Sequence, residues 1–79
     1  MNVQRSITRI KQRVRLDSSA IEAVKYDQKR QTLDVEFREG HSYRYMDVPE
    51  FVYRELLNAK SAGVFWNAVK HYFKYLKLE

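Results

Sequence analysis

The fold is decided by the stretch Thr32-Leu33-Asp34-Val35-Glu36-Phe37-Arg38, in which polar and apolar side chains alternate without interruption. An extended chain places successive side chains on opposite faces, so Leu33, Val35 and Phe37 lie together on one face. Asp34 and Glu36 lie on the other face. The stretch is therefore predicted to be a β-strand with one face in the core and the other toward water.

The neighbouring segments extend this strand into a sheet. Glu39-Gly40 is predicted to form a tight reversal, because glycine readily adopts the positive φ that such turns require, and residues 41–47 return as a second strand. Residues 20–27 are predicted as a strand with a bulge near Ala23, since its larger apolar residues are unevenly spaced. Together these segments predict three antiparallel strands with one apolar face.

Two helices are predicted to cover that face. Asp47-Val48-Pro49-Glu50 is typical of a helix start, with an aspartate able to cap and a proline in the first turn. This helix runs to about residue 60, and Ser61-Ala62-Gly63 breaks it. Residues 64–77 have a second helical pattern, with aromatic residues on one half of the wheel. The predicted fold is α+β: a three-stranded antiparallel sheet covered on one face by two C-terminal helices, in the order β-β-β-α-α.

The excess positive charge lies at the N-terminus. The 79 residues include 15 lysines and arginines and 10 carboxylates, for a net charge of +5. The first sixteen residues contain no acid and five bases: Arg5, Arg9, Lys11, Arg13 and Arg15. The other 63 residues hold ten bases and ten acids, which cancel. We treat residues 1–13 as a basic arm, a feature that favours binding to polyanions.

The arm has three interpretations. Val3, Ile7, Ile10 and Val14 recur at helical spacing, as in a basic amphipathic helix that lies on a membrane surface or along a phosphate backbone. An arginine-containing segment without acids also resembles a mitochondrial transit peptide, although serine is scarce here. The third interpretation is a solvated extension that keeps the protein soluble.

Composition and motifs argue against catalysis. The chain has no cysteine, which excludes disulfides and thiol chemistry. His41 and His71 lack the repeated spacing of metal ligands, and Gly40 and Gly63 are isolated, so there is no glycine-rich phosphate loop. No apolar run reaches the ~20 residues that span a bilayer. We expect a cytoplasmic protein with no enzymatic activity, no cofactor and no metal.

Several different short motifs follow one another along residues 14–75. They are Val14-x-Leu16-Asp17-Ser18-Ser19-x-Ile21-x-x-Val24-x-Tyr26-Asp27, Thr32-Leu33-x-Val35-x-Phe37-x-x-Gly40, Tyr43-x-Tyr45, Val48-Pro49-x-x-Val52-Tyr53-x-x-Leu56-Leu57 and Phe65-Trp66-Asn67. In this order they resemble the KTSC domain, a family named after a segment at the C-terminus of some lysyl-tRNA synthetases. The resemblance implies a β-β-β-α-α domain over residues 14–77. It also suggests RNA binding, because some members of the family are part of lysyl-tRNA synthetases. Residues 78–79 resemble a cloning-tag remnant and are set aside.

RNA binding is the leading functional hypothesis, with a tRNA-like or single-stranded RNA as partner. The phosphates would be held by the arm and by a lysine stripe on the last helix. The predicted binding residues are Arg5, Arg9, Lys11, Arg13, Arg15, Lys70, Lys74 and Lys77. The open sheet face is a poor platform, because Asp34 and Glu36 would repel phosphates. Tyr43 and Tyr45 are expected to pack beneath the helices, with base stacking as the alternative role. Ordinary solvated lysines are the alternative interpretation of the stripe.

The alternative function is a protein-interaction or structural accessory domain with no role in nucleic-acid binding. Phe51 is the candidate contact residue, because the helical wheel places it on the polar side of the first helix. It could instead fold back onto the sheet. The oligomeric state is open, since the edge strands of a small sheet permit pairing with a second copy.

Overall fold

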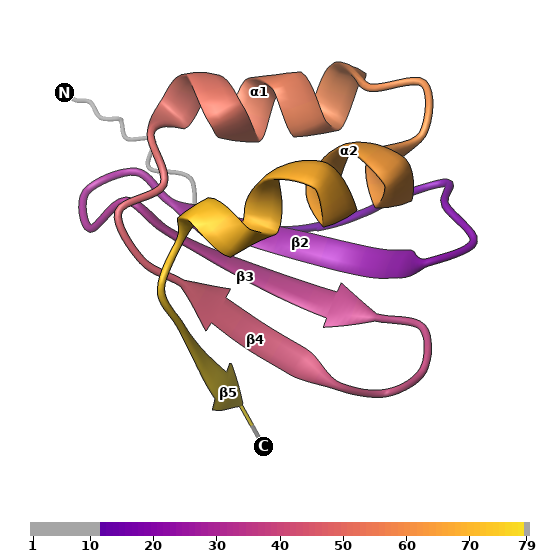
Figure 1. Cartoon of the computed structure of the whole chain (residues 1–79), viewed down its shortest axis with the longest axis horizontal. Coiled ribbons are helices and arrows are strands. Elements are labelled where there is room, and N and C mark those ends of the chain that lie inside the picture. The colour runs from indigo at the N-terminus through magenta and orange to yellow at the C-terminus, as the bar shows by residue number, and fades with distance from the viewer. Residues whose placement is uncertain (1–11, 79) are drawn as a thin grey trace, which may run out of the picture.

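The computed structural model describes residues 12–78. A five-stranded antiparallel sheet, in the order β1-β2-β3-β4-β5, is covered on one face by two helices (Figure 1). The elements are β1 (Arg13–Arg15), β2 (Ile21–Asp27), β3 (Thr32–Phe37), β4 (Ser42–Tyr45), α1 (Glu50–Asn58), α2 (Ala62–Val69), the 3-10 helix η2 (Lys70–Tyr72) and β5 (Tyr75–Leu78). The α+β class and the two covering helices are confirmed, whereas the prediction of three strands is wrong.

The centre of the sheet follows the alternation of the sequence. Leu33 and Val35 are fully buried beneath the helices, while their polar neighbours lie on the open face. The register of β2 against β3 shifts between Ile21 and Ala23, which confirms the predicted bulge. Gly40 has a φ of 109°, the left-handed conformation that the reversal between β3 and β4 requires.

β1 is a strand that the sequence analysis did not predict. It pairs with β2 through Arg13–Lys25, Val14–Val24 and Arg15–Ala23. Val14 packs against the core, so the helical spacing drawn through the arm does not extend to this residue. Pairing covers the edge of β2 and removes unpaired backbone groups from that edge, which accounts for a strand of only three residues.

β5 replaces the C-terminal half of the predicted second helix. The helix α2 ends at Val69, η2 follows, and the chain then pairs with β4 as a fifth strand. The prediction of a helix to Lys77 is therefore wrong. Strand pairing provides partners for the outer edge of β4, which a continuing helix would leave without them. Leu78, set aside in the sequence analysis, pairs with Ser42 in this strand.

The start of α1 differs from the predicted capping arrangement. Pro49, not Asp47, occupies the position before the first helical residue, and no side chain caps this end. Asp47 adopts a φ of 55°, which turns the chain out of β4 before the helix begins. The second helix is capped by Ser61, whose hydroxyl accepts a hydrogen bond from the Val64 backbone N–H at 3.2 Å.

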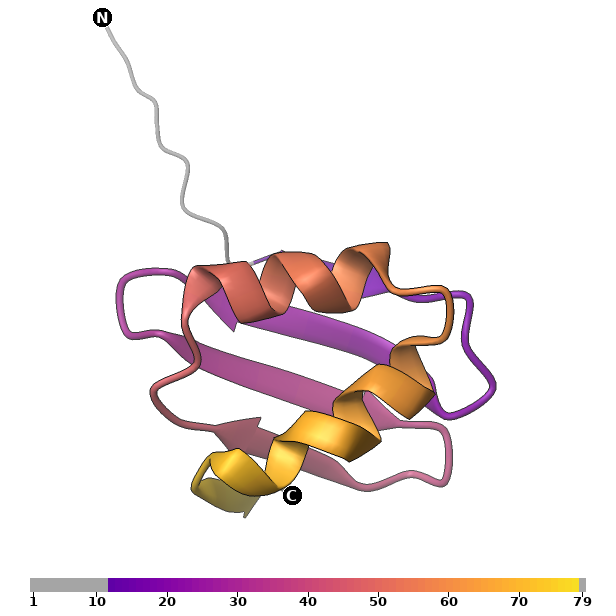
Figure 2. The same cartoon turned by 45° about the horizontal axis from the view of Figure 1, so that its top comes forward.

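Both helices lie on the same face of the sheet, α1 toward β2 and α2 toward β4 (Figure 2). Between them and the sheet lies a core whose largest fully buried side chain is Trp66. The Tyr26 ring stacks on Tyr53 at a centroid distance of 4.7 Å, and its hydroxyl donates to the Val48 carbonyl at 2.6 Å. Burial raises the pKa of the Tyr26 phenol, so this donor stays protonated at neutral pH.

Candidate nucleic-acid interface

Arginines on the open face of the sheet are held by carboxylates. Arg13 donates to both Glu36 oxygens at 2.8 and 3.0 Å, and Arg44 donates to both Asp34 oxygens at 2.7 and 3.0 Å. The hydrogen bond from Arg13 lowers the pKa of Glu36, which keeps that carboxylate ionised. Bidentate pairs of this kind fix both side chains against the sheet.

The remaining ion pairs also use arginine. Arg15 and Arg38 both contact the carboxylate of Glu22, and Arg54 contacts Glu50 one helical turn away. Of the five N-terminal bases predicted to bind phosphate, Arg13 and Arg15 are thus engaged with carboxylates of the domain. The others, Arg5, Arg9 and Lys11, lie outside the described residues.

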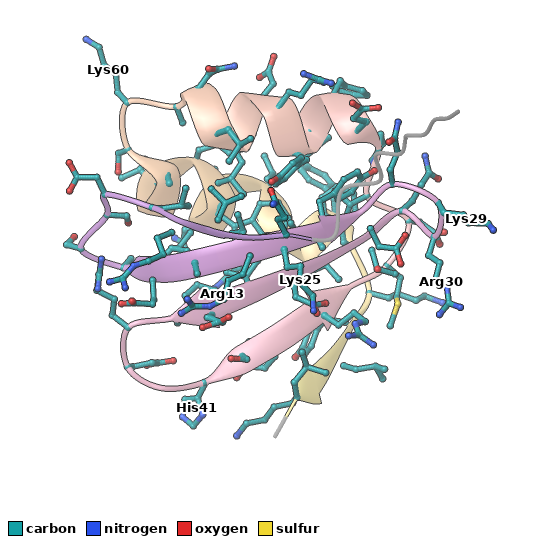
Figure 3. All side chains as sticks on the ribbon, turned by 180° about the vertical axis from the view of Figure 1, so that it is seen from behind. Arg13, Lys25, Lys29, Arg30, His41 and Lys60 are labelled. Atoms are coloured by element: carbon teal, nitrogen blue, oxygen red, sulfur yellow. The ribbon has the colours of Figure 1, made fainter. Side chains whose placement is uncertain are left out.

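The open face of the sheet therefore carries carboxylates that are paired with arginines. Asp34 and Glu36 lie on it as predicted, but each is bound by an arginine. Figure 3, which views this face, shows Arg13 and Lys25 beside each other over the central strands, in keeping with their paired positions in β1 and β2. This pairing reduces the repulsion that the two carboxylates would exert on phosphates. The paired arginines, however, can bind a phosphate only after they release their carboxylates, and that exchange costs free energy.

The lysines behave differently from the arginines. Within residues 12–78 no lysine forms an ion pair, and the six are Lys25, Lys29, Lys60, Lys70, Lys74 and Lys77. Three of them are far apart: Lys29 lies in the turn after β2, Lys60 follows α1, and Lys25 lies on the open face (Figure 3). Among residues 12–78, the positive charge without an ion pair therefore belongs to the six lysines and to Arg30.

The predicted helical stripe of lysines does not form. Lys70 begins η2, Lys74 lies between η2 and β5, and Lys77 lies within β5. Helical spacing no longer relates these residues, because the chain changes from helix to strand between them. Lys70 lines a hollow at the end of α2, and Lys77 is paired with Tyr43, which also lines it.

This aromatic hollow lies between η2 and strands β3 to β5 and has a volume of about 290 Å³. Four aromatic side chains line it together with three ionisable ones: Phe37, Tyr43, Tyr45 and Tyr75, and Glu39, Lys70 and His71. Tyr45 is almost completely buried, and burial raises the pKa of its phenol. Tyr75 is 60% exposed, so much of its ring surface faces solvent.

The rings of the hollow stand at steep angles to one another. Tyr43, in β4, is flanked by Phe37 from β3 at 6.0 Å and by Tyr75 from β5 at 5.4 Å between ring centroids. The interplanar angles are 69° and 90°, so both flanking rings rise steeply from the plane of Tyr43. The two rings thus make edge-type contacts with Tyr43 from the neighbouring strands, and we call this part of the aromatic hollow the slot.

Lysines border the slot. The Lys70 ammonium lies 5.6 Å from the centroid of the Phe37 ring, within the range of a cation–π contact. Lys77 is opposite Tyr43 in the register of β4 and β5, and residues paired in this way have side chains on the same face of the sheet. The slot therefore combines an aromatic interior with positive charge from two elements.

A second hollow adjoins the first. Its volume is about 500 Å³, and it shares Phe37, Glu39 and Lys70 with the aromatic hollow. From there it extends along α2, where Asn67 and Gly63 line it. The two hollows form a continuous depression between α2 and the turn that joins β3 to β4.

Sequence analysis identified the lysines of this site but not its aromatic residues. Tyr43 was expected to pack in the core in preference to stacking on bases, and Tyr75 was assigned to a helix. The alternation in Tyr75-Leu76-Lys77-Leu78 was the available indication of a strand, which would have placed Tyr75 and Lys77 on one face.

Phe51 lies on a separate part of the surface. Its side chain is 66% exposed, so the interpretation that it folds back onto the sheet is wrong. It borders a hollow of about 490 Å³ that Phe65 and Arg54 also line, between α1 and α2. This surface is a candidate contact for a partner but not part of the aromatic hollow.

Two features are absent from the part of the chain that the structure describes. None of its helices has the length and apolar character needed to cross a membrane. Its histidines and carboxylates form no cluster of three or more that could hold a metal ion.

Residues 17–73 match the model of the KTSC domain. The chain belongs to the KTSC domain family. A KTSC domain protein from Yersinia pestis has a crystal structure that superimposes with a TM-score of 0.82 at 36% identity, and the match covers 86% of this chain and 97% of that one. The resemblance found in the sequence is thereby confirmed.

Relatives of this KTSC domain occur both as small proteins and as part of a larger enzyme. A protein of Stutzerimonas stutzeri is 39% identical over 69 residues, which cover 85% of this chain and 97% of the relative. The lysine–tRNA ligase of Nostoc punctiforme is 41% identical over 63 residues, 78% of this chain but only 11% of the ligase. The KTSC domain is thus a small module that some lysine–tRNA ligases contain.

Proposed function

We propose that this KTSC domain is a non-catalytic, cytoplasmic module that binds single-stranded RNA through lysine–phosphate contacts. The observation that carries the proposal is the position of two lysines that have no ion pair within residues 12–78: Lys70 lines the aromatic hollow, and Lys77 is paired with Tyr43 of its lining. Free ammonium groups bind phosphates without first giving up a carboxylate. The lysine–tRNA ligase relatives support RNA as the polyanion.

The depression beside α2 favours a single strand over a duplex. It is formed by two adjoining hollows, and its sides are a helix and a turn, so an extended backbone fits along it better than a rigid double helix does. Binding of this kind depends on phosphate charge and carries little sequence information. The arm residues Arg5, Arg9 and Lys11 would add contacts of the same type.

The experiment measures the salt dependence of RNA binding for a charge-removing pair of substitutions. In the Lys70→Gln/Lys77→Gln variant, the plot of log K against log salt for a single-stranded RNA should become shallower by about 1.4, because each lost contact to a single strand removes about 0.7. Lys29→Gln/Lys60→Gln is the matched control, since it removes equal charge from positions outside the hollow.

The two outcomes that oppose the proposal differ. An equal effect of both double variants would mean that net charge, and not this site, governs binding. No RNA binding by the wild-type chain at low salt would remove the proposal altogether.

A protein-interaction module is the second candidate, and the exposure of Phe51 beside Phe65 favours it. An exposed aromatic side chain next to a hollow offers apolar area to a partner. This function predicts a protein that binds the purified wild-type chain and fails to bind the Phe51→Ala variant, with RNA binding absent in both. Retention of the partner by Phe51→Ala would exclude Phe51 as the contact.

A further inference from the structure

We propose that the aromatic hollow receives one unpaired RNA base, so that binding includes base stacking in addition to phosphate contacts. This inference rests on the proposed RNA-binding function and adds the part of the RNA that the hollow recognises. It assigns a role to Tyr75, Tyr43 and Phe37, which phosphate binding does not use.

The shape of the slot suits a flat ligand. Phe37 and Tyr75 flank Tyr43 from the neighbouring strands at steep ring angles, so a flat ring that enters the hollow meets aromatic side chains on more than one side. Aromatic side chains that keep an exposed face are the usual stacking partners of unpaired bases. Tyr75, at 60% exposure, presents such a face.

The size of the hollow limits the occupant. Its volume of about 290 Å³ lies at the lower end of the roughly 300–1,000 Å³ that small-molecule sites enclose. This is room for one base, and not for a segment of duplex or an amphipathic peptide helix. The adjoining hollow beside α2 continues from it and gives the flanking backbone a path.

The charges around the hollow favour a base inside and phosphates outside. Glu39 is part of the lining, and its carboxylate repels a phosphate that enters the slot but accepts hydrogen bonds from base N–H groups. Lys70, over the Phe37 ring, and Lys77, opposite Tyr43, are placed to hold the phosphates on either side of the inserted base. Charge and aromatic surface therefore select the same orientation.

The test compares an intact single-stranded RNA with the same oligonucleotide that carries abasic sites, by fluorescence anisotropy at low salt. Tyr75→Ala should weaken binding of the intact RNA about ten-fold, the loss of one stacked base, and should leave binding of the abasic RNA unchanged. Tyr75→Phe keeps the ring and should bind as the wild type does. Phe51→Ala is the matched control, because it removes an aromatic side chain of similar exposure away from the hollow.

A measurement without substitutions protects the test from folding defects. Ring-proton resonances of Tyr43 and Tyr75 should shift when the wild-type chain binds intact RNA, and should stay in place with abasic RNA. Equal binding of both RNAs by the wild type, or an unchanged affinity in Tyr75→Ala, overturns the inference.

The failure of this inference can be told apart from the failure of the proposed function. If the Lys70→Gln/Lys77→Gln variant loses RNA binding while Tyr75→Ala does not, only base stacking is wrong. If the wild-type chain binds neither RNA at low salt, the RNA-binding function and the stacking inference are both wrong.

Discussion

Gly63 stands where the first turn of α2 passes closest to the chain that enters β2. A Cβ atom at this position would lie 2.8 Å from the Cβ of Ala20, a separation that requires one of the two backbones to move. The absence of a side chain at Gly63 therefore sets how closely the helix approaches the sheet, and a larger residue acts on that packing directly.

We expect Gly63→Ala to destabilise the domain by about 1–2 kcal/mol, because overpacking costs about 1–3 kcal/mol and alanine returns up to about 1 kcal/mol of helix propensity. Urea denaturation followed by circular dichroism measures the change. Ala20→Gly should restore stability in the Gly63→Ala background, since it removes the other Cβ atom. A Gly63→Ala variant as stable as the wild type would contradict the close contact.

Glu36 provides a prediction about pH. The hydrogen bond from Arg13 lowers its pKa from the ordinary value of 4.5, so the pair stabilises the fold fully above that pH and less as pH falls through the lowered value. An NMR titration of the Glu36 carboxyl should give a midpoint below 4.5 that rises in Arg13→Gln. The energetic effect is small, because the pair is partly exposed to solvent.

Arg15→Gln is the control for this titration, because Arg15 pairs with Glu22 instead. An unchanged Glu36 midpoint in Arg13→Gln would mean that the contact does not persist in solution.

At the scale of the elements, the strands differ in how firmly they are held. β2 and β3 are central, with a partner on each side, whereas β1 and β5 are outer strands of three and four residues. Opening an outer strand exposes little apolar surface, so its hydrogen bonds open locally at a low free energy.

We therefore expect amide hydrogen exchange to be slowest in β2 and β3 and fastest in β1 and β5. The slowest central amides should exchange only with global unfolding, at the free energy measured by urea denaturation. NMR-detected exchange at neutral pH makes the comparison residue by residue. Protection in β5 equal to that in β3 would show that the outer strand belongs to the same cooperative unit as the centre.

The difference between central and outer strands also decides which elements the sequence could predict. The uninterrupted alternation from Thr32 to Phe37 identifies β3 because burial of one face imposes it. A strand as short as β1 carries too few residues for a period, and its place depends on the partner edge of β2. Residues 75–78 fit a helical pattern and a strand equally well, so only the unpaired edge of β4 decides between them.

At the scale of the whole molecule, the basic residues divide by type. Among residues 12–78, five of the six arginines form ion pairs and none of the six lysines does. Charge counting along the sequence cannot make this distinction, because it depends on which carboxylates the sheet brings within reach. For this reason Lys70 and Lys77 stay predicted contacts that binding experiments must test, while Arg13 and Arg15 are engaged in ion pairs of the fold.

The aromatic part of the candidate site lay beyond sequence analysis for a related reason. Phe37, Tyr43 and Tyr75 come from three strands, and they meet only because β5 adds to β4. When residues 75–78 are assigned to a helix, Tyr75 is no longer predicted to lie beside Tyr43 and Phe37. The site is thus a property of the sheet topology more than of any local motif.

The strand order has a mechanical consequence. Since β1 and β5 are the two outer strands, a longer polypeptide that contains this domain enters at one margin of the sheet and leaves at the other. Tension along such a polypeptide acts across the strands. The backbone hydrogen bonds between neighbouring strands therefore break one after another and not all at once. Under tension the outer strands β1 and β5 separate from the sheet first, and the central strands, on which the helices still pack, separate last.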